Sequence, residues 1–253
     1  AADPRLGLEQ RIAIRFALGE VADKRGEHNA AFSHFRQAND ARQTAMTKLD
    51  KVYDPNVMDQ LAERIVAIFH DTGTPADNAN ASEQPVFVVG MPRAGTTLAA
   101  QIIASHPDAE SRGEAASISS LVPNFPDDTD DGGVSAPGNR ALASLSSSAM
   151  RVVDKTPFHF MHIGYIRRHL PNARIVLCRR DNEDVALSCY FQNFLGDHPW
   201  AADLGDIGRF IAFHDRLVDH WQGLHADAIL ELHYEAVIAD AETQCRRLID
   251  HVG

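Results

Sequence analysis

The stretch VVGMPRAGTT, residues 88 to 97, combines residue types that can hold an anion. An apolar run ends at Gly90, and a helix is predicted to begin at Thr96. A helix N-terminus offers unpaired backbone N–H groups and the positive end of the helix dipole, and a glycine there lets the backbone approach a phosphate closely. The stretch therefore predicts a phosphate-binding loop whose donors are Arg93, Ala94, Gly95, Thr96 and Thr97.

The same loop lacks the residue that a nucleoside triphosphatase needs. The form GxxxxGK[ST] carries a lysine directly after its second glycine, and that lysine reaches the terminal phosphates. Thr96 occupies this position here. A magnesium-dependent P-loop kinase is therefore the less favoured reading of the loop.

A second candidate anion site follows in NARIVLCRRDNEDVALSCYF, residues 172 to 191. A predicted strand ends at Arg180, and Ser188 lies eight residues later, two turns into the next predicted helix. Open α/β sheets bind ligands at the carboxyl ends of their strands, and a guanidinium can hold a phosphate through two parallel hydrogen bonds. The alternative is that Arg179 and Arg180 are a solvated pair or form salt bridges with nearby aspartates.

Together these motifs resemble those of sulfotransferases that use 3′-phosphoadenosine 5′-phosphosulfate (PAPS). In that family a loop with a basic residue two positions before its second glycine binds the 5′-phosphosulfate without magnesium. An Arg at a strand end and a Ser eight residues later hold the 3′-phosphate. The resemblance implies the first role for the loop around Arg93, the second role for Arg180 and Ser188, and PAPS as a co-substrate with no metal.

The resemblance is closest to tyrosylprotein sulfotransferases and to bacterial sulfotransferases fused to tetratricopeptide repeats. Sulfuryl transfer to a hydroxyl needs a base for its proton and cations for the oxygen of the leaving nucleotide. The cytosolic small-molecule enzymes use the His of a KTH sequence, where this chain has Pro157. The closer groups use a Glu in an HPxxxxxGE context, which HPDAESRGE matches with Glu114. The resemblance implies that Glu114 is the base and that Lys155, with Arg93, stabilises the bridging oxygen.

Further matches are less specific. Tyr234 resembles a Tyr that contacts the nucleotide, although an ordinary Tyr at a strand end fits equally well. His159 stands where the family pattern DKxPxNF has Asn, so we expect it to bear on acceptor binding. The acceptor hydroxyl is left open among tyrosine, another protein group, a glycan, a lipid and a small molecule. Family members continue beyond the equivalent of Gly253 with a basic loop, so we expect this domain to lack its C-terminal end.

The elements that must position these residues are predicted from periodicity. After residue 84, short apolar runs alternate with helical patterns, which predicts an α/β fold with a P-loop-like parallel sheet covered by helices. The predicted strands are 85–90, 151–155, 173–178 and 228–234, and the predicted helices are 96–106, 158–170, 183–194, 206–224 and 241–252. The acidic, glycine-rich stretch 124–139 is expected to be a mobile loop beside the site.

The first part of the chain predicts helices at 8–26, 28–46 and 55–69, because apolar residues recur three or four positions apart. The first two resemble one tetratricopeptide repeat, with small residues such as Gly19 where helices pack closely, and an ordinary helical hairpin is the alternative. We therefore predict three parts: an all-α segment at 1–70, a linker at 71–84 and a sulfotransferase domain at 85–253.

Composition limits the classes of partner. The 253 residues are 44% hydrophobic, and 24 Lys and Arg against 35 Asp and Glu give a net charge of −11, which disfavours nucleic acid and anionic membranes. Three cysteines without CxxC spacing argue against a disulfide framework or a zinc ribbon and fit a reducing, cytoplasmic setting. No apolar run reaches the length of a transmembrane helix. Thirteen histidines occur without HExxH spacing, so no metal site is expected.

The main alternative to an enzyme is a non-catalytic interaction protein. Under this hypothesis the helical repeats bind a protein partner and the nucleotide-binding fold is vestigial. We disfavour it because five candidate residues are present together: Arg93, Glu114, Lys155, Arg180 and Ser188. The resemblance therefore implies a bacterial sulfotransferase that takes a nucleotide donor and an acceptor hydroxyl, the cysteines favour a cytoplasmic setting, and the repeat-like helices suggest a protein partner.

Overall fold

The computed structural model describes residues 6–115, 117–122, 124–127, 137–194, 196 and 198–253. The chain forms two compact units. The helical unit contains the chain up to Met58 and Asn182–Ala212, and the sheet unit contains Asp59–Asp181 and Phe213–Gly253. Each unit is described separately below.

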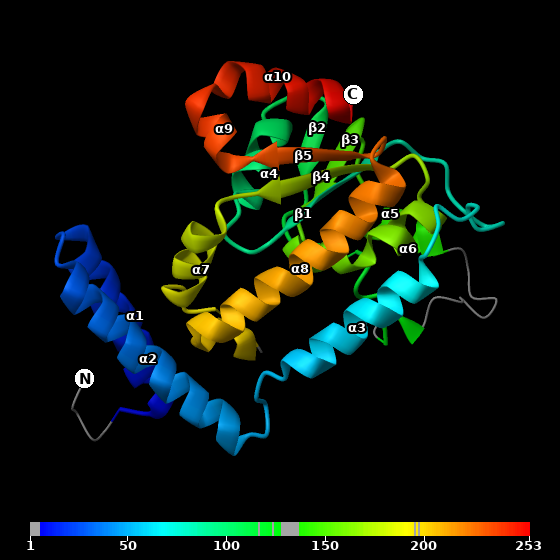
Figure 1. Cartoon of the computed structure of the whole chain (residues 1–253). Helices are drawn as coiled ribbons and strands as arrows, with labels where there is room; N and C mark the ends of the chain where they lie inside the picture. Colours follow the sequence, from blue (N-terminus) through cyan, green and yellow to red (C-terminus); the bar gives the residue numbers. More distant parts are fainter. Residues whose placement is uncertain (1–5, 116, 123, 128–136, 195, 197) are drawn as a thin grey trace. The chain divides into compact units, whose positions relative to one another are not determined.

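The sheet unit is built on a five-stranded parallel sheet with the order β2-β3-β1-β4-β5 (Figure 1). Its strands are β1 (Pro85–Gly90), β2 (Ala109–Ser111), β3 (Arg151–Asp154), β4 (Arg174–Arg179) and β5 (Ile229–His233). The central strand β1 is buried along its whole length, which explains its continuous apolar run. In the register of the sheet, Phe87 of β1 lies beside Asp154 of β3 and Ile175 of β4.

Helices flank this sheet (Figure 1). They are most of α3 (Pro55–Ile68), α4 (Thr96–Ala104), α5 (Pro137–Ser144), the 3-10 helix η2 (Pro157–His162), α6 (Ile163–His169), the C-terminal part of α8 (Leu204–His225), α9 (Tyr234–Ala239) and α10 (Ala241–Val252). Helix α4 packs on β1 and on α10, and η2 also packs on β1. Trp221 of α8 is fully buried and donates its indole N–H to the carbonyl of Phe160 at 2.8 Å, which fixes α8 to η2.

The predicted α/β fold with a parallel sheet is therefore confirmed, and so are its four predicted strands. Some predicted bounds were wrong. The helix expected at 158–170 begins as the 3-10 turn η2 after Pro157, and the short elements β2, α5 and α9 were not expected. Within the expected loop at 124–139, residues 128–136 lie outside the described residues, and the helix α5 begins at Pro137, so the final part of that expectation is wrong.

The helical unit contains α1 (Leu8–Lys24), α2 (His28–Lys48), α7 (Asn182–Tyr190), the 3-10 helix η3 (Pro199–Ala202) and the N-terminal part of α8. The two first helices pack closely at Gly19, where a Cβ atom would lie 2.6 Å from the ring of Phe35. This confirms the predicted helical pair, while its repeat character stays a prediction.

The helix predicted at 183–194 ends early, at Tyr190. The chain beyond it is held on α2 instead of continuing as a helix. The buried amide of Asn39 donates to the carbonyl of Tyr190 at 2.8 Å, the guanidinium of Arg42 donates to Asn193 Oδ1 at 2.5 Å, and Phe35 stacks on Phe191 with ring centroids 4.2 Å apart. Helix α7 and the segment after it are therefore anchored to the N-terminal helices.

No helix in the described part of the chain combines the length and the apolar character needed to cross a membrane.

Candidate active site

The predicted site residues of the sheet unit follow the carboxyl ends of different strands. Glu114 follows β2, Lys155 follows β3, the predicted phosphate loop follows β1, Arg180 follows β4 and Tyr234 follows β5. Because all five strands are parallel, these segments leave the same edge of the sheet. The strand order puts the segments of Glu114 and Lys155 on one side of the loop and those of Arg180 and Tyr234 on the other.

The loop between β1 and α4 has the backbone of an anion-binding turn. At Gly90, with φ of 138°, a Cβ atom would lie 2.4 Å from the carbonyl oxygen of Cys178, so only glycine fits. Arg93 adopts a φ of 71°, which is unusual for a side chain other than glycine and is typical of functional loops. Gly95, with φ of 97°, then caps α4, whose first residue is Thr96. Such a loop can turn successive N–H groups toward an anion.

Arg180 and Tyr234 meet this loop. The guanidinium carbon of Arg180 lies 4.7 Å from the ring centroid of Tyr234, which is a cation–π contact. A Cβ atom at Gly95 would lie 3.1 Å from that same ring, and Arg180 Nη1 donates to the carbonyl of Arg93 at 3.5 Å. Tyr234 is the first residue of α9 and not a strand residue. The structure thus brings together four of the predicted site residues: Arg93, Gly95, Arg180 and Tyr234.

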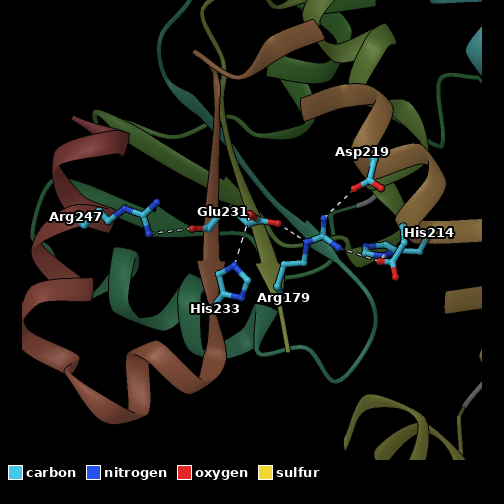
Figure 2. Close-up of polar contacts among 7 residues, drawn as sticks. Arg179, His214, Asp219, Glu231, His233 and Arg247 are labelled. Carbon is cyan, nitrogen blue, oxygen red and sulfur yellow. Dashed lines mark hydrogen bonds and ion pairs between the residues drawn. The ribbon is translucent and has the colours of Figure 1, made fainter. Parts of the chain in front are cut away.

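Arg179 has a different environment, as Figure 2 shows. Its guanidinium is 3.0 Å from Asp215 and 3.4 Å from Asp219, both on α8, and it also pairs with Glu231 on β5. Arg179 is the last residue of β4 and pairs with carboxylates of α8 and β5, whereas Arg180 follows the strand and contacts the loop and Tyr234. Arg179 therefore forms salt bridges, as the alternative prediction said. Its partners lie on α8 and β5 and are not the aspartates that follow it directly in the sequence.

Glu114 and Lys155 form an ion pair, with Lys155 Nζ 2.5 Å from Glu114 Oε1. The side chain of Lys155 is 15% exposed and that of Glu114 is 62% exposed. An ion pair with one such exposed member contributes at most about 1 kcal/mol, so the carboxylate can turn from the ammonium toward another polar group at low cost. This arrangement puts a carboxylate and a cation side by side at the edge of the sheet.

Ser188 lies in α7 and belongs to the helical unit. Its part in phosphate binding stays a prediction that rests on its spacing from Arg180 in the sequence. Among the described residues, no group of three or more His, Cys, Asp and Glu side chains is arranged to hold a metal ion. The expectation of metal-free chemistry likewise stays a prediction.

A family model described as "Sulfotransferase family" matches residues 85–144 and 134–253. This chain belongs to the sulfotransferase family. A region of the "Uncharacterized protein" of Aquifex aeolicus (strain VF5) is 29% identical to 98% of this chain, and the match covers 35% of that protein. A "Putative protein-tyrosine sulfotransferase" of Caenorhabditis briggsae is 30% identical over 41% of this chain and 41% of its own length. The chain thus spans less than half of the length of these relatives.

Two solved sulfotransferases are also similar to this family member. The enzyme from Alicyclobacillus acidocaldarius aligns with a TM-score of 0.48 and 16% identity, over 67% of this chain and 81% of its own. Sulfotransferase STF9 from Mycobacterium avium aligns with a TM-score of 0.47 and 17% identity, over 68% of this chain and 64% of its own.

A buried polar cluster that was not expected from the sequence lies next to the Glu114–Lys155 pair. Asp154, which is fully buried, accepts hydrogen bonds from the backbone N–H and hydroxyl of Ser117 at 3.0 and 2.5 Å and from the hydroxyl of Thr156 at 2.5 Å. His159 is also fully buried, and its Nε2 accepts the N–H of Ser119 at 3.3 Å. His159 stands where the family pattern has Asn, and we expected it to bear on acceptor binding. Because the His159 side chain does not reach the surface, any such effect could only be indirect.

The buried histidines predict that the folded protein is sensitive to acid. Burial lowers the pKa of His159 to about 4 and that of His162 to about 3. A histidine in the unfolded chain has a pKa of about 6.5. Below that pH the unfolded chain therefore binds more protons than the folded chain does. We expect the free energy of unfolding to fall by about 2 kcal/mol per ring between pH 7 and pH 5, and to keep falling toward the folded pKa values.

Urea unfolding at a series of pH values checks this expectation. His162→Leu should remove the contribution of one ring and flatten the curve. His70→Leu is the matched control, because its ring is 73% exposed, and it should follow the parent curve. An unfolding free energy that does not change from pH 7 to pH 5 would contradict the neutral, buried state of these rings.

Proposed function

We propose that this chain transfers a sulfuryl group from PAPS to an acceptor hydroxyl. One observation supports this most directly, which is the convergence of complementary groups on a single edge of the sheet. The Glu114–Lys155 ion pair lies on one side of the β1–α4 loop in the strand order, and the Arg180–Tyr234 contact lies on the other. The first pair suits proton removal and charge stabilisation, and the second suits an anionic nucleotide.

On the donor side, we assign the 5′-phosphosulfate to the loop. Backbone N–H groups and hydroxyls of Gly95, Thr96 and Thr97 would donate to it, Ala94 would add its backbone, and Arg93 would offset its charge. Arg180, together with Ser188, would hold the 3′-phosphate. The Tyr234 ring, in contact with both Gly95 and Arg180, would line the nucleotide between the two phosphates.

On the acceptor side, Glu114 would take the proton of the acceptor hydroxyl as its oxygen attacks sulfur. A new bond forms between that oxygen and sulfur while the bond from sulfur to the bridging oxygen of the donor breaks. Lys155 and Arg93 would stabilise the negative charge that develops on the bridging oxygen. The products are a sulfate ester and adenosine 3′,5′-bisphosphate, and no metal takes part.

The identity of the acceptor and the cellular setting form the less specific part of the proposal. The name of the Caenorhabditis briggsae relative refers to protein tyrosine, so a tyrosine hydroxyl is the first acceptor to test, before glycans and small phenols. The odd number of cysteines, without CxxC spacing, favours the reducing cytoplasm as the setting. We place the chemistry in 85–253, after the linker 71–84, and leave the helices of 1–70 as a surface for a protein partner.

The variant Arg180→Ala tests the donor site. We expect its affinity for adenosine 3′,5′-bisphosphate to fall about tenfold to a hundredfold, as for the loss of a hydrogen-bonded charge pair, with little change for AMP, which lacks the 3′-phosphate. Equilibrium titration measures both affinities. Arg246→Ala is the control, because Arg246 is an exposed arginine that pairs with Glu242 within α10. Equal losses for the two nucleotides would remove Arg180 from the 3′-phosphate site.

A further inference from the structure

The position of Glu114 poses a physical problem. It follows β2, which has three residues and lies at the edge of the sheet, where β3 is its neighbour. So short an edge strand is a weak anchor, and an ion pair with a largely exposed carboxylate adds at most about 1 kcal/mol. A base must nevertheless stay within hydrogen-bond reach of its proton. Other contacts must therefore hold the segment that carries Glu114.

Hydrogen bonds to the end of β3 provide these contacts on both sides of Glu114. Before it, the carbonyl of Gly113 accepts the backbone N–H of Lys155 at 2.8 Å. After it, the backbone N–H and the hydroxyl of Ser117 both donate to Asp154 Oδ2. We call the two hydrogen bonds from Ser117 to Asp154 the Asp154 latch. Glu114 is thus bracketed by contacts with two successive residues of the chain, Asp154 and Lys155.

The latch has the chemistry of a strong contact. Asp154 is fully buried, and a buried carboxylate is stable only when donors surround it. Hydrogen bonds to such a charge are about twice as strong as those between neutral groups. Thr156 supplies a donor to the other oxygen, at 2.5 Å. The neutral ring of His159 turns its Nδ1 to Asp154 Oδ2 at 3.6 Å while its Nε2 accepts Ser119 N–H, which extends the attachment by two residues.

We propose that Asp154 is a positioning residue that holds Glu114 beside Lys155 through the latch to Ser117. This inference rests on the proposed function, since it assumes that Glu114 is the base. Two successive residues thus have different tasks: Asp154, the buried last residue of β3, fixes the backbone of the segment, and Lys155, which follows it, pairs with the carboxylate of Glu114. The latch therefore links the buried core to the placement of the base.

Two variants test this proposal, and each of them removes one hydroxyl group that donates a hydrogen bond to Asp154. Ser117→Ala removes a donor that belongs to the latch, and Thr156→Val removes a donor to the other carboxylate oxygen, Oδ1 of Asp154. We expect Ser117→Ala to speed amide hydrogen exchange at residues 117 and 119 by about tenfold to a hundredfold. Thr156→Val should leave that exchange close to the parent rate.

Turnover separates a positioning role from a purely structural one. With sulfur-35-labelled PAPS, and a tyrosine-containing peptide and 4-nitrophenol as acceptor probes, Ser117→Ala should lower kcat about tenfold or more, because a displaced base loses its geometry. Its affinity for adenosine 3′,5′-bisphosphate should not change. Faster exchange with unchanged kcat, or equal effects of the two variants, would overturn the proposal.

The same experiment distinguishes failure of the latch from failure of the proposed function. A parent protein that binds adenosine 3′,5′-bisphosphate yet labels neither probe would contradict the proposed transfer to such hydroxyls, and with it the positioning role. The exchange rates at residues 117 and 119 would still show whether the latch holds the segment.

Discussion

Replacing Glu114 with Gln is expected to lower turnover by roughly two to four orders of magnitude, the usual contribution of a general base. Gln keeps the size and hydrogen-bonding reach of the side chain but cannot accept a proton from a hydroxyl. The donor phosphates are assigned to other residues, so the affinity for adenosine 3′,5′-bisphosphate should stay close to that of the parent. Transfer of sulfur-35 from labelled PAPS to the tyrosine peptide and to 4-nitrophenol measures turnover. Calorimetric titration measures the affinity for adenosine 3′,5′-bisphosphate.

Glu110→Gln is the matched control for this prediction. Glu110 lies four residues earlier, on β2, and its carboxylate is 3.1 Å from Arg112 and accepts the hydroxyl of Ser147 at 2.5 Å. It is a glutamate of the same segment that already has structural partners, so its replacement should change stability more than turnover. Parent-like turnover of the Glu114 variant would show that another group, or water alone, takes the proton.

Lys155→Met is expected to lower turnover by about two to three orders of magnitude, as for the loss of one group that stabilises developing charge. Met has a similar length and keeps the packing of the largely buried stem, while the ammonium is lost. The charge on the bridging oxygen rises in the transition state, so the loss should fall on kcat more than on donor affinity. Glu114 loses its ion-pair partner as well, but its exposed carboxylate remains solvated.

Lys48→Met, on the exposed last turn of α2, provides the control for removing a lysine charge. A Lys155 variant that loses donor affinity while its kcat stays close to that of the parent would indicate that Lys155 binds donor and transition state equally. Such a result would contradict its assignment to the bridging oxygen.

The fold of the sheet unit could be predicted because its signal is local. Each long strand is an apolar run followed by a helical period, and the central strand carries the strongest run because both of its faces are buried. The strand β2 escaped prediction because three residues at a sheet edge show no alternation. The end of α7 at Tyr190 was missed for another reason, since the contacts from Asn39 and Arg42 come from about 150 residues away in the sequence.

The candidate site also has some features that depend on local sequence and others that depend on contacts between distant residues. The spacing within the loop around Arg93 and the strand-end position of Arg180 are local properties, and the structure brings both to the same edge. The difference between Arg179 and Arg180 is not local, because it depends on the carboxylates of α8 and β5. Asp154 was missed because its partner Ser117 is 37 residues away, and a sequence pattern cannot show that pairing.

Calorimetric titration of the unmodified protein with adenosine 3′,5′-bisphosphate, beside AMP and ATP with magnesium, tests the central claim most directly. We expect saturable binding of one adenosine 3′,5′-bisphosphate per chain without magnesium, and clearly weaker binding of AMP, because we assign the 3′-phosphate its own site at Arg180. A folded protein that binds AMP equally well, or that prefers ATP with magnesium, would contradict a PAPS site at this edge of the sheet.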